Sequence, residues 1–223
     1  MLLERFQQGF DTAFGTPDAR GVIRSEAAHF QVEEQLGFEP SGEGEHCFLL
    51  IQKTGENTES VARKLARFAG VPARDVSYSG LKDRNAVTTQ WFGVHLPKRD
   101  VFAWSEINEQ NLQVLQQTWH RKKLRRGVHQ SNRFKITIAE LSGQSDELSH
   151  RLERIKASGV PNYFGEQRFG FGGQNLVHAE DLLLQNKKVK QRHLKSMYLS
   201  SARSLLFNSV LSERVKQGSW IKR

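Results

Sequence analysis

Cysteine is almost absent from this chain, because Cys47 is the one thiol among 223 residues. A single cysteine forms no disulfide within the chain and no cysteine-based zinc site, which favours a reducing compartment. No apolar run approaches the ~20 residues that a membrane helix needs. The N-terminal segment MLLERFQQGFDTAF has no apolar core of signal-peptide length. The sequence therefore predicts a soluble, cytoplasmic protein.

Several familiar catalytic motifs are missing as well. FGFGG (169–173) lacks the third glycine of a dinucleotide fingerprint, and QKTG (52–55) lacks the glycines of a phosphate-binding P-loop. The eight histidines show no HExxH or similar spacing, so no metal site is predicted. There is no G-x-S-x-G elbow of a serine hydrolase. What remains is a basic protein with aromatic and glycine clusters.

Positive charge is what the chain has in excess. It contains 33 Lys and Arg residues against 24 Asp and Glu residues, a net charge of +9. A surplus of this size favours an anionic partner, with nucleic acid first, and a merely basic soluble protein is the alternative. Five of the six residues in RKKLRR (121–126) are basic. A polyanion partner explains such a block better than a solvated loop does.

Strand and helix signals are mixed without the regular alternation of a doubly wound fold, which predicts an α+β fold. Apolar or β-rich runs predict strands at 46–53, 76–78, 86–96 and 112–118, and the alternation of Phe134, Ile136 and Ile138 predicts a half-buried strand. Helices are predicted after Asn57, at 145–158 and at 200–215. From about residue 160 no further strand cluster is visible, so a mostly helical second unit is predicted there.

One acid stands out in SGLKDRNAVTTQWF (79–92), where Asp83 lies between Lys82 and Arg84. A solvated turn aspartate is the simplest interpretation. Alternatively, the two cations keep the carboxylate ionised as a nucleophile or base, and the same cations hold an RNA backbone against it.

SNRF (131–134) places an amide, a cation and an aromatic ring together just beyond the basic block. An aromatic ring beside an amide can stack on a base and bond to its edge. The alternating pattern alone instead favours a core position for Phe134.

Four blocks, GLKDRNAVTTQWF (80–92), SNRF (131–134), GVPNYFGEQRFG (159–170) and SARSLLFN (201–208), together resemble the tRNA pseudouridine synthase D family. The resemblance implies part of a pseudouridine synthase catalytic domain over 1–158, with a mixed or antiparallel sheet. The start of a mostly helical insertion domain then follows over 159–223. It also implies isomerisation of uridine 13 of tRNA to pseudouridine without a cofactor. The implied partner is tRNA, with no membrane and no protein partner.

Carried over position by position, the resemblance makes Asp83 the catalytic aspartate, with Lys82 and Arg84 as substrate-binding neighbours. Asn132 and Phe134 match the family's N-x-F motif, whose ring is expected to stack near the target base. This expectation reverses the core assignment that alternation alone gives to Phe134.

Two features depart from the family pattern. Where the family has a lysine near the N-terminus, this chain has Arg24, which keeps the charge with a different geometry and is carried over as a substrate contact. Family members also continue beyond residue 223 and return to the catalytic domain with further strands. The chain is therefore expected to be a C-terminally truncated member, either an RNA-isomerising enzyme or an inactive RNA-binding remnant.

Overall fold

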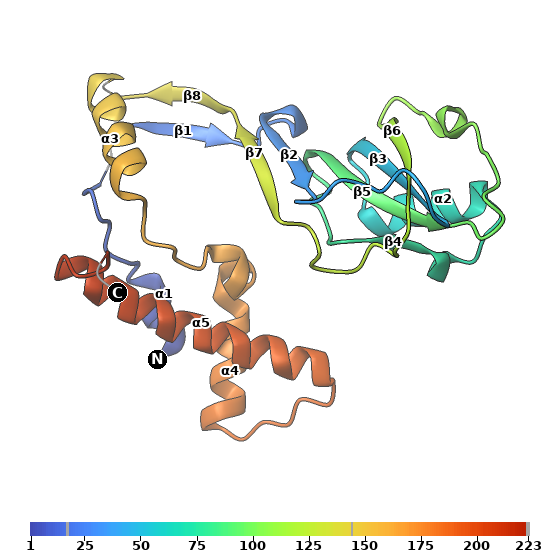
Figure 1. The fold of residues 1–223 in the computed structure, drawn as a ribbon. Coiled ribbons are helices and arrows are strands. Elements are labelled where there is room, and N and C mark those ends of the chain that lie inside the picture. Colours follow the sequence, from blue (N-terminus) through green and yellow to red (C-terminus); the bar gives the residue numbers. More distant parts are fainter. Residues whose placement is uncertain (17, 144, 222–223) are drawn as a thin grey trace. The chain divides into compact units, whose positions relative to one another are not determined.

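The computed structural model describes residues 1–16, 18–143 and 145–221. The chain divides into a sheet unit, Arg20–Ser142, and a helical unit made of Met1–Ala19 and Gly143–Arg223 (Figure 1). The predicted α+β class, with a mixed sheet and a helical C-terminal part, is confirmed. The break between these units differs from the expected boundary at 158/159, and the assignment of catalytic and insertion domains stays a prediction.

The sheet unit contains one mixed sheet. Its strands are β2 (Phe30–Gln35), β3 (His46–Thr54), β4 (Val76–Tyr78), β5 (Val87–His95), β6 (Leu112–His120) and β7 (Ser131–Ile136). They lie in the order β6-β3-β5-β2-β7, with β4 also paired to β5. The β2–β5 pair is parallel and the other pairs are antiparallel. The strands predicted at 46–53, 76–78, 86–96 and 112–118 are confirmed as β3 to β6.

A separate two-stranded ribbon is formed by one strand that precedes this sheet in the chain and one that follows it. β1 (Arg20–Ile23) pairs with β8 (Ile138–Ser142) in an antiparallel arrangement. β1 ends at Ile23, directly before Arg24, so the ribbon leads into the segment that carries Arg24.

Helix α2 (Thr58–Phe68) covers one face of the sheet. Alternation along β3 turns one set of apolar side chains toward the apolar face of α2, and the buried members are Cys47, Leu49, Ile51, Val61 and Leu65. Each such side chain contributes roughly 1.5–3 kcal/mol when buried. The helix begins after Asn57, as predicted. This packing holds in place the short turn between β3 and α2.

Strand β7 forms an edge of the sheet beside β2. The strand predicted from Phe134, Ile136 and Ile138 is confirmed as β7 and the start of β8. Its half-buried character is wrong, because Phe134 is 56% exposed and Ile136 is 49% exposed on this edge strand. The assignment of Phe134 to the core is wrong for the same reason.

The helical unit contains α1 (Leu2–Gln7), α3 (Ser145–Ser158), α4 (Gln174–Leu184) and α5 (Arg192–Lys216). The helix predicted at 145–158 is confirmed, and the one predicted at 200–215 is the second part of the longer α5. Phe169, Leu176 and Leu205 form the core of this unit. Gly173 has a φ of +79°, and a Cβ there would lie 2.7 Å from Leu3 Cδ1, so the start of α4 requires glycine.

The third and fourth sequence blocks lock together inside this helical unit. The Asn208 side chain accepts from the Phe164 N–H and donates to the Phe164 carbonyl, both at 2.9 Å. Arg168 donates from Nε to Ser204 Oγ at 3.0 Å, and Ser201 Oγ donates to the Arg168 carbonyl at 2.9 Å. These contacts join the 159–170 segment to α5. The polar side chains of both sequence blocks therefore have a structural role in holding the two segments together.

Candidate active site

Asp83 lies in the loop 79–86, which connects β4 to β5. β4 pairs with the second half of β5, whereas β2 pairs with its first half along 87–89. The Asp83 side chain is 32% exposed, and its Oδ2 lies 3.5 Å from Arg24 Nη1. Its Oδ1 accepts the Asn85 N–H at 2.9 Å. The carboxylate is therefore oriented by two groups while one side stays open to solvent.

Arg24 connects Asp83 to two aromatic rings. Its guanidinium carbon lies 4.0 Å from the centre of the Phe30 ring, and its backbone has a φ of 60°. The Phe30 ring lies 5.9 Å from the ring of Phe134. Phe134 pairs with Val32 across β2 and β7, so its side chain shares a face with Phe30. The structure thus brings together Asp83, Arg24 and Phe134, which the sequence predicted as site residues.

Lys82 points inward, away from solvent. Its ammonium pairs with the Glu34 carboxylate, and the two side chains are 5% and 0% exposed. Glu34 Oε1 also accepts the Trp91 N–H at 3.2 Å. The cation paired with Asp83 is thus Arg24, far away in sequence, and not the adjacent Lys82. This pairing cannot be read from local order, because it depends on where β2 begins.

Arg84 and Asn132 have different neighbours, and neither side chain forms a hydrogen bond or ion pair with the Asp83 carboxylate among the described residues. Arg84 Nε donates to the Gly55 carbonyl at 3.0 Å, and its side chain is exposed. Asn132 lies opposite Glu34 in the β2–β7 register, with Nδ2 3.3 Å from His129 Nε2. Asn132 Oδ1 is buried and has no hydrogen-bond partner among the described residues. Asn132 is therefore close to the Lys82–Glu34 pair rather than to the Asp83 carboxylate.

Lys53 is a residue that the sequence interpretation missed. It is fully buried, and its ammonium donates to the Asp83 carbonyl at 3.1 Å. In the sequence, its segment QKTG stands out only as an incomplete P-loop. A lysine at an inward position of a buried, alternating strand was the available signal, because a buried charge requires partners.

The basic segment 121–126 forms a loop that is anchored by one buried side chain. Leu124 packs with Phe48 and Trp91, while the five cations around it are exposed. Directly after this segment, the Gly127 N–H donates to the Ser79 carbonyl at 2.6 Å. The basic loop and the Asp83 loop are therefore joined through the backbone.

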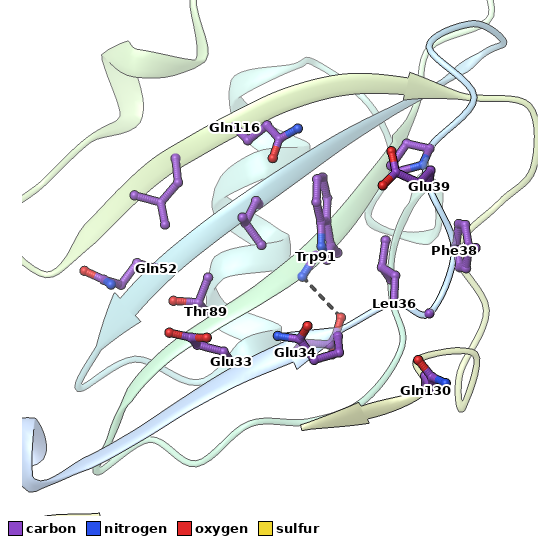
Figure 2. A pocket seen from close by; sticks show the side chains of 15 residues that line it. Glu33, Glu34, Leu36, Phe38, Glu39, Gln52, Thr89, Trp91, Gln116 and Gln130 are labelled. Atoms are coloured by element: carbon purple, nitrogen blue, oxygen red, sulfur yellow. Dashed lines mark hydrogen bonds between the residues drawn. The ribbon is translucent and has the colours of Figure 1, made fainter. Parts of the chain in front are cut away.

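A cavity of about 770 Å³ lies on the other face of the sheet (Figure 2). Thr89 pairs with both Glu33 and Gln52, so their side chains share this face. Figure 2 also shows the Trp91 N–H bonded to Glu34, which is one of the residues that line this cavity. Cavity size does not decide where chemistry occurs, and the carboxylate with a paired cation and an aromatic neighbour is the better candidate.

No helix within residues 1–16, 18–143 and 145–221 has the length and apolar character needed to cross a membrane. Within the same residues, no group of three or more His, Cys, Asp or Glu side chains is arranged to hold a metal ion.

Comparison with known proteins gives the family. The sequence model of the family described as tRNA pseudouridine synthase D (TruD) matches residues 12–190. A tRNA pseudouridine synthase D from Methylococcus capsulatus is 51% identical over 215 residues, which cover 95% of this chain and 61% of the relative. The protein of the same name from Cellvibrio japonicus is 48% identical over 219 residues, which cover 96% of this chain and 65% of the relative.

A solved structure shows the same fold at lower identity. The crystal structure of the putative tRNA pseudouridine synthase D from Methanosarcina mazei superposes with a TM-score of 0.74 at 21% identity, covering 96% of this chain and 64% of that one. The chain thus spans about 60% of the length of the curated relatives that it matches. With its family model matching most of the sequence and its relatives about 50% identical, the chain belongs to the tRNA pseudouridine synthase D family.

Proposed function

We propose that the protein is a tRNA pseudouridine synthase that acts in the cytoplasm on uridine 13 of tRNA, with Asp83 as its catalyst. Two relatives carry this enzyme name. The observation that carries the proposal is the partly open Asp83 carboxylate, held by Arg24 at 3.5 Å and followed by the Phe30 and Phe134 rings. This arrangement offers an anion, its counter-ion and a stacking surface within one unit.

The chemistry requires few groups, because the reaction is an isomerisation. The bond between the sugar C1′ and the base nitrogen breaks, the base turns, and C1′ bonds to a base carbon; that carbon then loses a proton, and the released nitrogen gains one. No atoms are added and no electrons are transferred overall. A carboxylate can attack the sugar or remove a proton from it, and the site must then retain the detached base. Asp83 can serve in either of these roles.

The remaining residues take supporting roles in this proposal. Phe134 stacks on the extruded base, since its ring is exposed on the same face as Phe30. Arg24 orients the Asp83 carboxylate, and exposed Arg84 contacts phosphate. Lys82 contributes through its buried pair with Glu34, which anchors the loop from below, and Asn132 lies beside that pair.

The direct test is pseudouridine formation in unmodified tRNA by a full-length protein, meaning this chain extended by the C-terminal segment of a relative. We expect turnover at uridine 13 and none in a tRNA with another base at that position. Turnover at a different uridine would support the enzyme class and contradict the assignment to uridine 13.

RNA binding without turnover is the second candidate for the 223 residues themselves. The chain spans only 61% and 65% of two relatives, so activity is proposed for the whole protein. Binding and turnover should be measured with both the 223-residue chain and the full-length protein. Binding by both with turnover by the longer one alone would support the second candidate.

A further inference from the structure

The turn between β3 and α2, with the sequence KTGENT (53–58), lies directly against the Asp83 loop. The Gly55 N–H donates to the Arg84 carbonyl at 3.0 Å, and Arg84 Nε donates back to the Gly55 carbonyl at 3.0 Å. The Lys82 N–H donates to Thr58 Oγ1 at 3.0 Å. With the bond from Lys53 to the Asp83 carbonyl, each residue of the Lys82-Asp83-Arg84 motif is bonded to this turn.

Buried side chains close the arrangement from β5. Thr58 Oγ1 donates to Gln90 Oε1 at 2.8 Å, and Gln90 Nε2 donates to the Gly80 carbonyl at 3.1 Å. Both Thr58 and Gln90 are buried. Because buried polar groups are costly to leave unpaired, this network specifies one position for the loop.

Lys53 is the one charged member of the turn that is fully buried. Its ammonium donates to the Glu56 carbonyl at 2.6 Å and to the Asp83 carbonyl at 3.1 Å. A buried ammonium is retained only where it gains strong hydrogen bonds. Both of these acceptors are main-chain carbonyls, so the charge fixes backbone rather than another side chain.

We infer that residues 53–58 are a cradle for the Asp83 loop and that Lys53 is a positioning residue for Asp83. The catalytic meaning of this inference rests on the proposed function, whereas the cradle itself is a statement about the loop. Lys53 holds the Asp83 backbone through its carbonyl, while Arg24 and the Asn85 N–H orient the Asp83 carboxylate. A small displacement of a reacting group costs about a hundredfold in rate, so a loosened loop is expected to lower turnover.

The ionisation of Lys53 gives this inference a pH signature. Burial, with a smaller contribution from Lys82, lowers the pKa of Lys53 from 10.5 to about 8, and the carboxylates of Asp83 and Glu56 oppose this shift. Two further charges lie next to these groups. Lys64 pairs with Glu56 at 2.7 Å, and Glu34 pairs with Lys82. As the pH rises through 8, Lys53 loses its charge and holds the two carbonyls less strongly.

Stability responds in the opposite direction to turnover. Between pH 8 and 10.5 the unfolded chain keeps the Lys53 proton that the folded chain has released. The unfolded state then binds more protons, so this group makes folding more favourable as the pH rises. A fall in turnover without a matching fall in stability is therefore the mark of weakened positioning.

The test compares Lys53→Met with Lys98→Met, which removes an exposed lysine of the same unit. With full-length protein and unmodified tRNA, we expect Lys53→Met to lower kcat by about a hundredfold and to change KM by less than about twofold. The fall of wild-type kcat above pH 8 should be absent from Lys53→Met and present in Lys98→Met. Lys53→Arg, which stays charged, should recover part of kcat and move the fall to higher pH.

Hydrogen exchange of the amides of residues 82–86 tests the cradle without any assay of activity. Lys53→Met should accelerate it, and Lys98→Met should not. If Lys53→Met does not fold, Thr58→Val removes the acceptor of the Lys82 N–H and provides the same test. If the wild-type protein forms no pseudouridine, the proposed function is overturned. Faster exchange in Lys53→Met would still support the cradle in that case. Wild-type exchange and wild-type kcat in Lys53→Met would overturn the inference.

Discussion

The surroundings of Asp83 and the cavity of about 770 Å³ on the other face of the sheet differ in charge. Around Asp83 the structure gathers exposed Arg24 and Arg84, buried Lys53, and Lys82, which pairs with Glu34. The cavity is lined by exposed Glu33 and Glu39, by buried Glu34 and by four glutamines, with no lysine or arginine among the described residues that line it. An RNA backbone is attracted by the exposed arginines and repelled by the exposed glutamates. Charge, rather than cavity volume, thus separates the candidate site from this cavity.

The largest effect on this comparison is expected from Asp83→Asn. We expect turnover to fall on the order of a thousandfold or more, because an amide is neither an anionic nucleophile nor a base. The amide oxygen can still accept the Asn85 N–H, and the ion pair with Arg24 that the variant removes is partly exposed, so thermal unfolding should change little. Pseudouridine formation and the melting temperature are measured on the same preparation. Near-normal turnover would remove Asp83 from the mechanism.

Phe134→Ala comes next. Loss of stacking on a base is worth about 1–3 kcal/mol, which corresponds to a fall in kcat/KM of roughly fivefold to 150-fold. Ile136→Ala is the matched control, because Ile136 lies two residues further along β7 and is similarly exposed. If both variants lose activity equally, the effect comes from the edge strand and not from the aromatic ring.

Much of this candidate site could be predicted from the sequence, but only the parts that short motifs contain. The 79–92 block identified Asp83, and the N-x-F motif identified an exposed ring that simple alternation placed in the core. The pairing of Arg24 with Asp83 and the position of Lys53 join segments that lie far apart in the chain, so they required the fold. Conversely, the missing glycines excluded a P-loop at QKTG (52–55), but the sequence could not show the contacts that Lys53 makes.

The fold followed the same rule. The strands β3 to β6 have continuous apolar or β-rich runs and were found, whereas β2 alternates with charged residues and was missed. α4 was also missed, because it follows a Gly-rich segment that conceals its start at Gly173.

The basic segment 121–126 is a second source of positive charge, anchored through Leu124 against Phe48 and Trp91 on the face that also carries the cavity. Reversing Lys122 and Lys123 to Glu should weaken binding of every tRNA about equally and lower the slope of log affinity against log salt by about one for every phosphate that the variant no longer neutralises. Lys123 also donates to the Arg74 carbonyl at 3.0 Å, so folding of the variant is checked by circular dichroism. Reversal of exposed Arg63 and Arg67 on α2 is the control for total charge. Weaker binding of one tRNA alone would contradict this role.

The smallest effect is expected on the other face of the sheet. Gln52→Ala together with Gln116→Ala removes two side chains that line the large cavity (Figure 2). The structure gives neither side chain a contact with the Asp83 loop, since Gln52 shares a face with Thr89 and Gln116 pairs with Leu50. We therefore expect kcat, KM and tRNA affinity to stay within about twofold, as is usual for surface substitutions away from a site. A tenfold fall in kcat at unchanged stability would show that residues of this cavity take part in the reaction. The contrast in charge between the surroundings of Asp83 and the cavity would then no longer locate the active site.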